Sequence, residues 1–388
     1  MPQRRQQGKP ARTVLEQKIW ERGETLAEFV EYAERFARQV GERGTLSERN
    51  LKRLVAGSSS NSSPIGQPRP ATSRLLERIF GLPVDILLGS PNSSHGADKE
   101  LQEELRQLLH VSGRLDAPLL AVLQDQLHAI RRLDRQLGTV VTRDEVTVKC
   151  QQVASLLTHS TTISTRSRLA ALLSEFETLA GWQALDAGDV SNAWHHYEQA
   201  KGAARESGLV AFETHAAAEQ AFVLLEIGKY SAANDLLAET RKRAEKKTNN
   251  ELRAWLAAAH GEALAALGES LESLCAFDRA IALLPAESSC EDDPYVALDP
   301  IHLNRWRGHA LTRLSRPEAV DVLSSALKRL DPTFARAEAS LRTDLASAFF
   351  HRGEYEGARN QATQAHILAS DIGSLRQLRR LNLLQLTR

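Results

Sequence analysis

GWQALDAGDVSNAWHHYEQA, residues 181–200, returns in altered form as AFVLLEIGKYSAANDLLAET, residues 221–240, and as GEALAALGESLESLCAFDRA, residues 261–280. The three stretches align without a gap at a spacing of 40 residues. Each stretch begins with a small residue, has a glycine at its eighth position and has another small residue at its thirteenth position. A fixed internal period of this length is typical of repeat architectures, in which one supersecondary unit is stacked many times.

The positions shared by the repeats predict a pair of helices. The glycine ends the first helix, and the small residue seven positions before it allows the second helix to approach closely. The second helix carries a small, an apolar and a small residue on one face. A fourth copy has its glycine at Gly353, and a weaker unit between the last two uses Ala319, Leu323 and Ala326, with Pro332 after it.

These small, aromatic and small positions resemble those of the tetratricopeptide (TPR) helix pair, and Pro285 falls where that motif ends in proline. Residues 169–371 resemble five TPR units, and a final helix over 374–386 is predicted to cap the array, which therefore spans 169–388. The spacing of 40 residues exceeds the roughly 34 of the motif, and the tryptophan of the first helix is displaced. An irregular helical bundle with chance spacing is the alternative.

The N-terminal part of the chain predicts five further helices. Thr-x-x-Glu pairs at Thr13/Glu16, Thr25/Glu28 and Thr45/Glu48 fit the capping box, in which hydroxyl and carboxylate satisfy free amides at a helix start. Glycines mark the ends. The expected helices run to about residue 21, from 26 to Gly41, from 46 to 56, from 71 to 80 and from 84 to 88.

The eleven residues from Ser47 to Gly57, SERNLKRLVAG, resemble the recognition helix of XRE-type (phage-repressor-like) helix-turn-helix domains. The match covers about residues 12–89, and the whole arrangement is similar to XRE regulators with TPR sensor domains. The resemblance implies a DNA-binding domain. Departures are Val55, which stands where the family usually has an acidic residue, and an insertion at 35–44.

The major groove of double-stranded DNA admits one α-helix, whose N-terminal half presents side chains to base edges. Asparagine pairs with adenine and arginine with guanine, whereas other cations contact phosphates and fix register. We expect Ser47 to cap the helix, Arg49, Asn50 and Arg53 to contact bases, and Lys52, Arg69 and Arg74 to contact phosphates. The alternative is that these charges form the solvated face of a helical bundle.

Two segments separate the predicted DNA-binding domain from the repeats. Turn formers and small polar residues at 89–96 predict a linker at 90–98. Residues 99–168 are predicted to form a helical connector, with an amphipathic stripe from Leu115 to Leu137. Packing of that stripe on its own neighbours is favoured over a homodimer interface, because the spacing holds no strict heptad. Residues 1–11 are expected to form a basic, disordered tail.

In TPR arrays the first helix of each pair lines the concave face, so the resemblance places a group of aromatic and charged side chains in one groove. An acidic groove with aromatic walls would bind a peptide, a small cationic or apolar molecule, or a protein partner. Packing within the array is an equally good reading of Trp182 and Trp255. The groove residues predicted as the binding site are Trp182, His215, Phe222, Glu226, Trp255, Glu262 and Arg305.

Composition supports an all-α, globular protein, with 42% hydrophobic, 25% charged and 5% aromatic residues. Residues 1–90 carry 15 Lys and Arg against 10 Asp and Glu, whereas the whole chain has a net charge of zero. No apolar stretch is long enough to span a membrane, and the first ten residues show no signal peptide, so a cytoplasmic location is expected. Three distant cysteines suggest no disulfide or zinc site.

The sequence lacks a glycine-rich phosphate loop and the common hydrolase and zinc motifs, so we expect neither enzymatic activity nor a cofactor or metal. The first functional hypothesis is an all-α transcriptional regulator that joins a five-helix helix-turn-helix domain, a helical connector and a TPR-like α-solenoid that senses a ligand. The second is a TPR adaptor whose N-terminal domain does not bind DNA.

Overall fold

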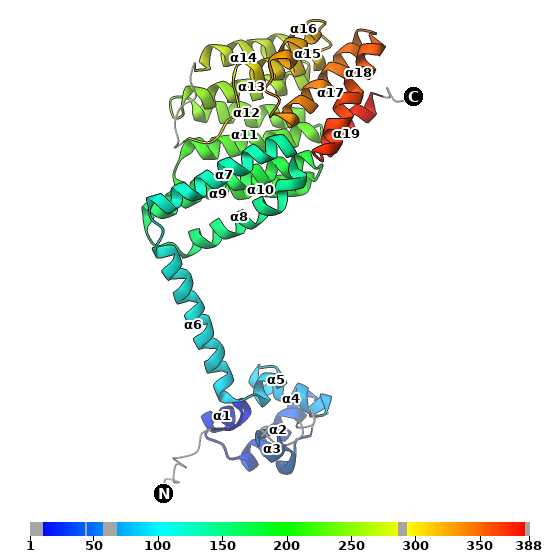
Figure 1. The fold of residues 1–388 in the computed structure, drawn as a ribbon. Coiled ribbons are helices and arrows are strands. Elements are labelled where there is room, and N and C mark those ends of the chain that lie inside the picture. The colour runs from blue at the N-terminus through cyan, green and yellow to red at the C-terminus, as the bar shows by residue number, and fades with distance from the viewer. Residues whose placement is uncertain (1–10, 43–44, 57–67, 286–292, 385–388) are drawn as a thin grey trace. The chain divides into compact units, whose positions relative to one another are not determined.

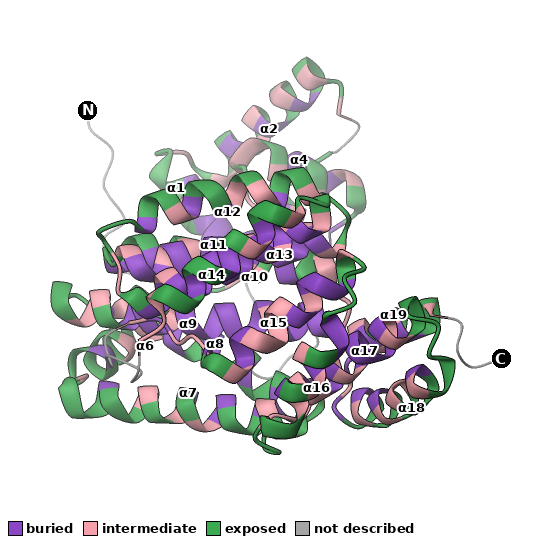
Figure 2. Ribbon diagram, turned by 90° about the horizontal axis from the view of Figure 1, so that it is seen from above, coloured by how far each residue is buried: buried purple, intermediate pink, exposed green. Residues whose placement is uncertain are grey.

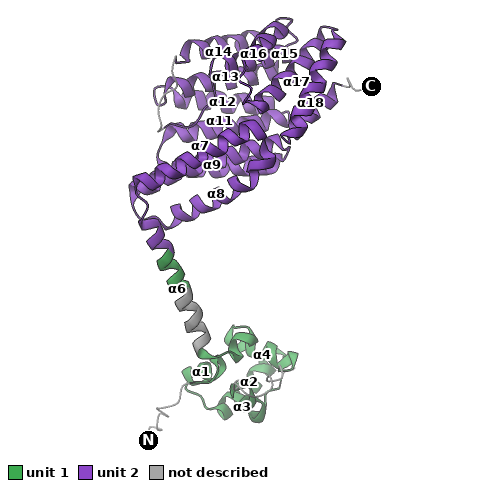
Figure 3. Cartoon of the chain, viewed as in Figure 1, with its two compact units in different colours: residues 1–107 green, residues 108–388 purple. Residues whose placement is uncertain are grey.

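The computed structural model describes residues 11–42, 45–56, 68–285 and 293–384, and for 92–100 it gives the helical backbone alone. In these ranges the regular structure is entirely α-helical, as predicted. The chain divides into two compact units, residues 1–107 and residues 108–388 (Figure 3). Among the described residues, no helix is both long and apolar enough to cross a membrane.

The first unit holds the five helices that the sequence predicts (Figure 1). Leu15, Phe29, Leu51 and Leu75 from four of these helices are completely buried in one core. The backbone N–H of Val14 donates to the carbonyl of Gly89 at 2.9 Å, which joins the start of the unit to its end. The helices are α1 (Val14–Glu21), α2 (Leu26–Val40), α3 (Glu48–Val55), α4 (Pro70–Phe80) and α5 (Val84–Leu88).

The predicted capping boxes have three different outcomes. Thr25 and Glu28 form the complete reciprocal pair at the start of α2. At α1 the hydroxyl of Thr13 caps as predicted, but the Glu16 carboxylate accepts from the N–H of Arg12 at 2.7 Å. The prediction at Thr45 was wrong, because α3 begins two residues later, where the Oγ of Ser47 accepts from the N–H of Asn50 at 3.3 Å.

The segment expected to be a linker at 90–98 is helical instead. Helix α6 runs without interruption from Pro91 to Gly113, and the boundary between the two units falls inside it, after Gln107. Proline suits the first position of a helix, because its fixed φ is helical and its missing N–H is not needed there. The strong helix formers after residue 98 then extend the same helix. Their propensity therefore overrides the turn-forming composition of residues 89–96.

The second unit contains the five predicted helix pairs, including the weak fourth one (Figure 1). Each pair joins a first helix to a shorter or equal second helix, and successive first helices pack on one another. The pairs are α9 (Ile163–Asp186) with α10 (Val190–Ser207), α11 (Val210–Glu226) with α12 (Tyr230–Ala244), α13 (Asn250–Leu267) with α14 (Ser270–Leu283), α15 (Pro300–Arg313) with α16 (Ala319–Arg329), and α17 (Ala335–His351) with α18 (Tyr355–Asp371). Helix α19 (Leu375–Leu383) follows them.

Close approach within a pair depends on the small residue of the first helix, as the repeat pattern predicts. A Cβ built on Gly261 would lie 2.7 Å from the ring of Phe277, and one on Gly308 would lie 2.4 Å from Leu323. The hydroxyl of Ser273 also donates to the carbonyl of Gly261 at 2.8 Å. The large residues of the second helices are thus seated directly on the backbone of the first, and Figure 2 shows the first helices α9, α11 and α13 largely buried.

The segment expected to be a separate connector belongs to the array. Helices α7 (Ala117–Leu137) and α8 (Thr139–His159) pack on α9 and lie within the second unit. The predicted stripe is only partly buried: Leu127 and Ile130 are in the core, whereas Leu119, Leu133 and Leu137 are between 40% and 46% exposed. Arg131 and Asp134 of the same helix are buried as well. Arg131 donates to Glu175, and Asp134 accepts from Arg336.

The array closes on itself, since α7 packs against α17 and α19 packs against α9. Two glycines with positive φ permit this contact. A Cβ on Gly138, between α7 and α8, would lie 2.2 Å from the carbonyl oxygen of Ile372, and one on Gly373, between α18 and α19, would lie 2.4 Å from Val140. The concave side of the repeats is therefore enclosed by helices from both ends of the unit.

Substitution of Gly261 by alanine is expected to destabilise the second unit. The added methyl group overpacks the contact with Phe277, at a cost of about 1–3 kcal/mol, and the better helix propensity of alanine offsets about 1 kcal/mol of it. Gly202, in helix α10, has no atom within 4 Å of an added Cβ, so Gly202→Ala should raise the melting temperature. Thermal unfolding of both variants measures the difference, and a stabilised Gly261→Ala variant would disprove the seating of Phe277.

Asp134→Ala tests the closure of the array. The Asp134 carboxylate accepts from Thr142 at 3.0 Å, Gln183 at 2.8 Å and Arg336 at 2.9 Å, all buried. Its removal leaves the Arg336 guanidinium with the Asp186 carboxylate alone, 3.6 Å from its Nε, and the loss of a buried partner costs up to about 3–5 kcal/mol. Denaturant unfolding followed by tryptophan fluorescence should show that loss. The exposed Asp144 of α8 supplies the control, since Asp144→Ala should change stability by less than about 0.5 kcal/mol.

Candidate functional site

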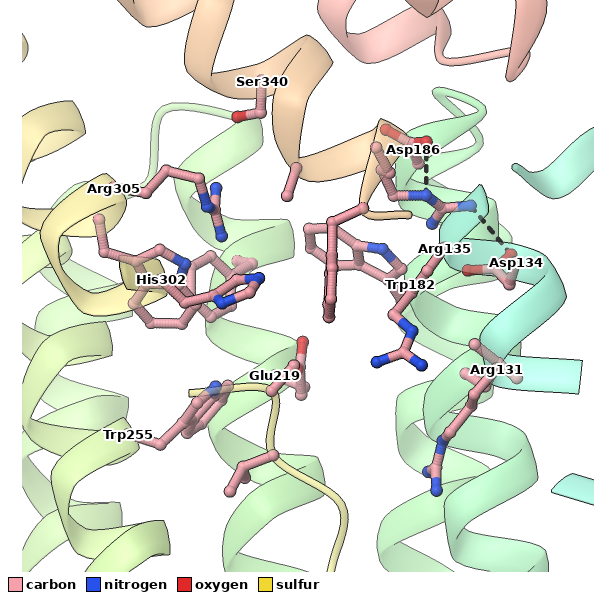
Figure 4. Close-up of a pocket in the computed structure, with 18 of the residues that line it drawn as sticks. Arg131, Asp134, Arg135, Trp182, Asp186, Glu219, Trp255, His302, Arg305 and Ser340 are labelled. Atoms are coloured by element: carbon pink, nitrogen blue, oxygen red, sulfur yellow. Dashed lines mark hydrogen bonds and ion pairs between the residues drawn. The ribbon is translucent and has the colours of Figure 1, made fainter. Parts of the chain in front are cut away.

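A pocket of about 240 Å³ lies inside the second unit, at the centre of the closed array (Figure 4). Its walls come from the first helices α9, α11, α13, α15 and α17, from α7 and α19, and from the segment 295–297 between α14 and α15. The five repeat units supply the first five of these helices, one from each pair. The closing contacts of α7 and α19 supply the rest and turn a groove into a pocket.

One wall of the pocket is aromatic. The Trp255 ring packs edge-on against Trp306 with the centroids 5.8 Å apart, and Phe222 contacts both indoles at 6.2 and 5.7 Å. Trp255 is only 3% exposed, so it serves packing within the array as well as lining the pocket. Trp182 is half-buried and lies 5.7 Å from the guanidinium carbon of Arg376.

The prediction of an acidic groove was wrong. Among the described residues, six arginines line the pocket against four carboxylates. Four of the arginines come from α7 and α19, the helices that the sequence analysis kept apart from the groove. The arginines are Arg131, Arg135, Arg305, Arg336, Arg376 and Arg380, and the carboxylates are Asp134, Asp186, Glu219 and Glu262.

Most of the arginines are held by carboxylates of other helices. Arg131 donates to Glu175 at 2.6 Å and Arg376 to Glu226 at 2.7 Å. Arg380 pairs with the fully buried Asp344, whose pKa stays well below its usual range because the charges of Arg380 and His309 outweigh the effect of burial. These pairs join α7 to α9, α19 to α11 and α19 to α17, so they also fix the walls.

Two titratable groups of the pocket are held in unusual states. Burial raises the pKa of Glu219 to about 7, against the opposing hydrogen bond from the Tyr197 hydroxyl at 3.4 Å. Burial lowers the pKa of His215 to about 4, so its imidazole is neutral at physiological pH. A carboxyl group that is half-protonated near pH 7 weakens the acidic character of the pocket further.

Six of the seven predicted groove residues line this one pocket: Trp182, His215, Phe222, Trp255, Glu262 and Arg305. The seventh, Glu226, lies outside the lining and holds Arg376 in place. The sequence analysis missed the lining residues of α7 and α19, and also His302, Trp306 and Arg336. The repeat register could have placed Trp306, which stands on a first helix, whereas nothing in the sequence indicates that α7 and α19 close the array.

The first unit presents the residues predicted to contact DNA on α3 and α4. Leu51, Leu54 and Val55 of α3 are completely buried, which leaves Arg49, Lys52 and Arg53 exposed on the remaining face. Ser47 is exposed as the cap of α3, and Arg53 donates to the side-chain oxygen of the half-buried Asn50 at 3.1 Å.

The predicted phosphate contacts differ in how their charge is used. Lys52 pairs with Glu48 one turn away at 2.6 Å. Arg69 and Arg74 of the fourth helix are exposed and form no ion pair with any described residue, and neither does Arg49. Three cations of this surface are therefore available to an external anion as far as the described residues extend.

No family model matches the sequence, and no curated protein matches it. Similar solved structures include two crystal structures of a kinesin light chain from Podosopora anserina with nearly identical TPR-like repeats, one of them carrying the substitution Q17M. Both are 17% identical to this chain and cover 50% of it and 93% of their own length. The TM-scores are 0.34 and 0.33.

Glu219 predicts a pH-dependent stability of the second unit. Its folded-state pKa of about 7 lies above the ordinary 4.5, so the folded state binds more protons between these values and stability falls as pH rises through that window. Glu219→Gln should remove this dependence, changing the variant's free energy of unfolding relative to wild type by up to about 3 kcal/mol between pH 4.5 and pH 8. Denaturant unfolding at several pH values measures it.

Glu239→Gln, at an exposed position of α12, controls for the loss of a carboxylate. Parallel stability profiles for the Glu219→Gln variant and the wild-type protein would contradict the raised pKa.

Proposed function

We propose that the chain is a DNA-binding transcriptional regulator whose C-terminal helical array binds a ligand or partner in the central pocket. The observation that carries the first half is the distribution of side chains on α3. Its apolar residues are buried in the first unit, and its arginines and lysine are exposed along the remaining face. A short amphipathic helix of this kind can lie in the major groove without giving up its core contacts.

A hydrogen bond places a second basic helix beside the start of α3. The hydroxyl of Thr72, in the first turn of α4, donates to the carbonyl of Thr45 at 3.3 Å. The N-terminal ends of α3 and α4 are therefore close together, with Arg69 at the N-cap of α4. Free backbone N–H groups at helix N-termini attract phosphates, and an arginine there adds a charge-assisted contact. The arrangement supports phosphate contacts by α4 next to base contacts by α3.

The array supports the second half of the proposal through its pocket. Buried apolar walls with a few convergent charged groups are features of a ligand site. A homodimer stays a prediction: Leu119, Leu133 and Leu137 of α7 are exposed and would supply an apolar contact. The alternative function is that of an adaptor that binds only proteins, and it is favoured if the first unit does not bind DNA.

Base-contacting and phosphate-contacting residues should respond differently to substitution. Asn50→Ala or Arg53→Ala is expected to lose about 1–3 kcal/mol of discrimination at particular base pairs, with binding to random DNA nearly unchanged. Lys52→Ala should weaken binding to all duplexes alike and reduce the salt dependence of affinity. Selection of preferred sites by the full chain, followed by fluorescence anisotropy on specific and random duplexes, measures both effects.

Lys18→Ala is the matched control, because Lys18 is a partly exposed lysine of α1 that pairs with Glu21 at 2.8 Å and lies outside α3 and α4. It should leave specific and random binding unchanged. Equal losses on both kinds of DNA for all variants would reject base contacts by α3. Absence of duplex binding at low salt would reject the regulator in favour of the adaptor.

A further inference from the structure

Arg305 differs from the other arginines of the pocket. It is partly buried, its Nε is covered and without a hydrogen-bond partner, and no described carboxylate lies within ion-pair distance of it. Glu262 and Asp344 act on it only through their more distant charges, and Asp344 is already paired with Arg380. Burial of a charge without a partner is costly, so a site that retains an unpaired arginine is arranged for a counter-charge from outside the protein.

His302 stands one turn before Arg305 on α15 and also has a free polar atom. It is 5% exposed, and its Nε2 is buried without a partner among the described residues. Its Nδ1 lies 3.0 Å from the Asp299 carboxylate, which can only accept, so Nδ1 carries the proton and Nε2 is an acceptor. Arg305 and His302 together present donors and one acceptor to the pocket, which both line (Figure 4).

Arg135 is a second cation of the pocket without a carboxylate partner among the described residues. It donates to the Tyr295 hydroxyl at 3.0 Å, and its guanidinium carbon lies 4.6 Å from the Phe334 ring centroid. Arg135 and Arg305 are therefore the two arginines of the pocket that have no carboxylate within ion-pair distance among the described residues.

The aromatic wall of the pocket suits a ring. Trp255, Trp306 and Phe222 offer an aromatic ring on a short chain an apolar surface inside the second unit.

We propose that the central pocket binds a small organic anion with an aromatic or apolar body, and that Arg305 is the residue that holds its acidic group. Carboxylate and phosphate match the guanidinium fork, and a hydroxyl next to the acidic group finds the acceptor Nε2 of His302. A cationic ligand would add to the unpaired charge of Arg305 and Arg135. The inference rests on the proposal that the array binds a ligand and is independent of whether the first unit binds DNA.

The test uses the full chain and three matched compounds: 3-phenyllactate, its neutral amide 3-phenyllactamide, and the cationic 3-phenylpropylamine. Binding is measured by calorimetry and by the fluorescence of Trp182, Trp255 and Trp306, which line the pocket. The carboxylate should bind and the other two should bind at least about tenfold more weakly, because charge-assisted hydrogen bonds are lost. Arg305→Met should weaken binding of 3-phenyllactate by about tenfold or more.

Two controls separate binding from folding. Arg307→Met changes an arginine on the same helix that pairs with Asp278 at 2.8 Å and does not line the pocket, so it should leave binding unchanged. Without ligand, Arg305→Met should melt at the same temperature as wild type or higher, since it removes an unpaired buried charge.

Absence of 3-phenyllactate binding at millimolar concentration, equal binding of acid and amide, or full affinity in Arg305→Met would overturn the proposal. Preference for the amine or amide would overturn the anionic ligand while leaving a ligand-binding array in place. Duplex binding, measured separately, reports on the first unit alone.

Discussion

The contact between Gly138 and Ile372 governs the C-terminal unit, because it joins the first helix pair of the array to the last. Positive φ values at Gly138 and Gly373 allow the two turns to touch, and no side chain could be accommodated on either glycine. Next to this contact, Asp134 accepts from Thr142, Gln183 and Arg336, and Asp186 accepts from the Ser374 hydroxyl at 2.6 Å. Interiors this closely packed have few alternative arrangements. Closure thus converts an array with two free ends into a unit with a fixed interior.

The same contacts decide the chemistry of the interior. A row of first helices alone would offer the aromatic side chains and the carboxylates of α11 and α13. Closure adds Arg131 and Arg135 from α7 and Arg376 and Arg380 from α19, which changes the balance of the lining from acidic to basic. Arg376 and Arg380 are at once structural and part of the pocket wall, since each pairs with a carboxylate of another helix. The stability of the unit and the lining of the pocket therefore rest on shared residues.

The sequence predicted whatever is encoded locally. Gly188, Gly228, Gly268 and Gly353 marked helix ends because left-handed backbone favours glycine. Gly181 and Gly261 marked close packing because each faces a large residue, Tyr197 or Phe277, on the second helix of its own pair. Six groove residues followed from that register. Long-range pairing was invisible: Asp134 and Arg336 are 202 positions apart, and nothing local to either indicates the other. The linker prediction failed because it weighed the composition of residues 89–96 alone, whereas helix propagation in α6 acts over a longer stretch.

The pairing of charges in the pocket, rather than their number, argues for its function. A closed interior held only for stability would be expected to pair its buried charges, and four of the six arginines are paired in this way with Glu175, Asp134, Glu226 and Asp344. Arg305 is not, although it stands on a first helix in the middle of the array and an apolar residue of its size would pack there at lower cost. An anion of the right size would supply the counter-charge that Arg305 lacks among the described residues, and it would do so on α15, in the lining of the pocket. Its binding would add to the free energy that holds the array closed.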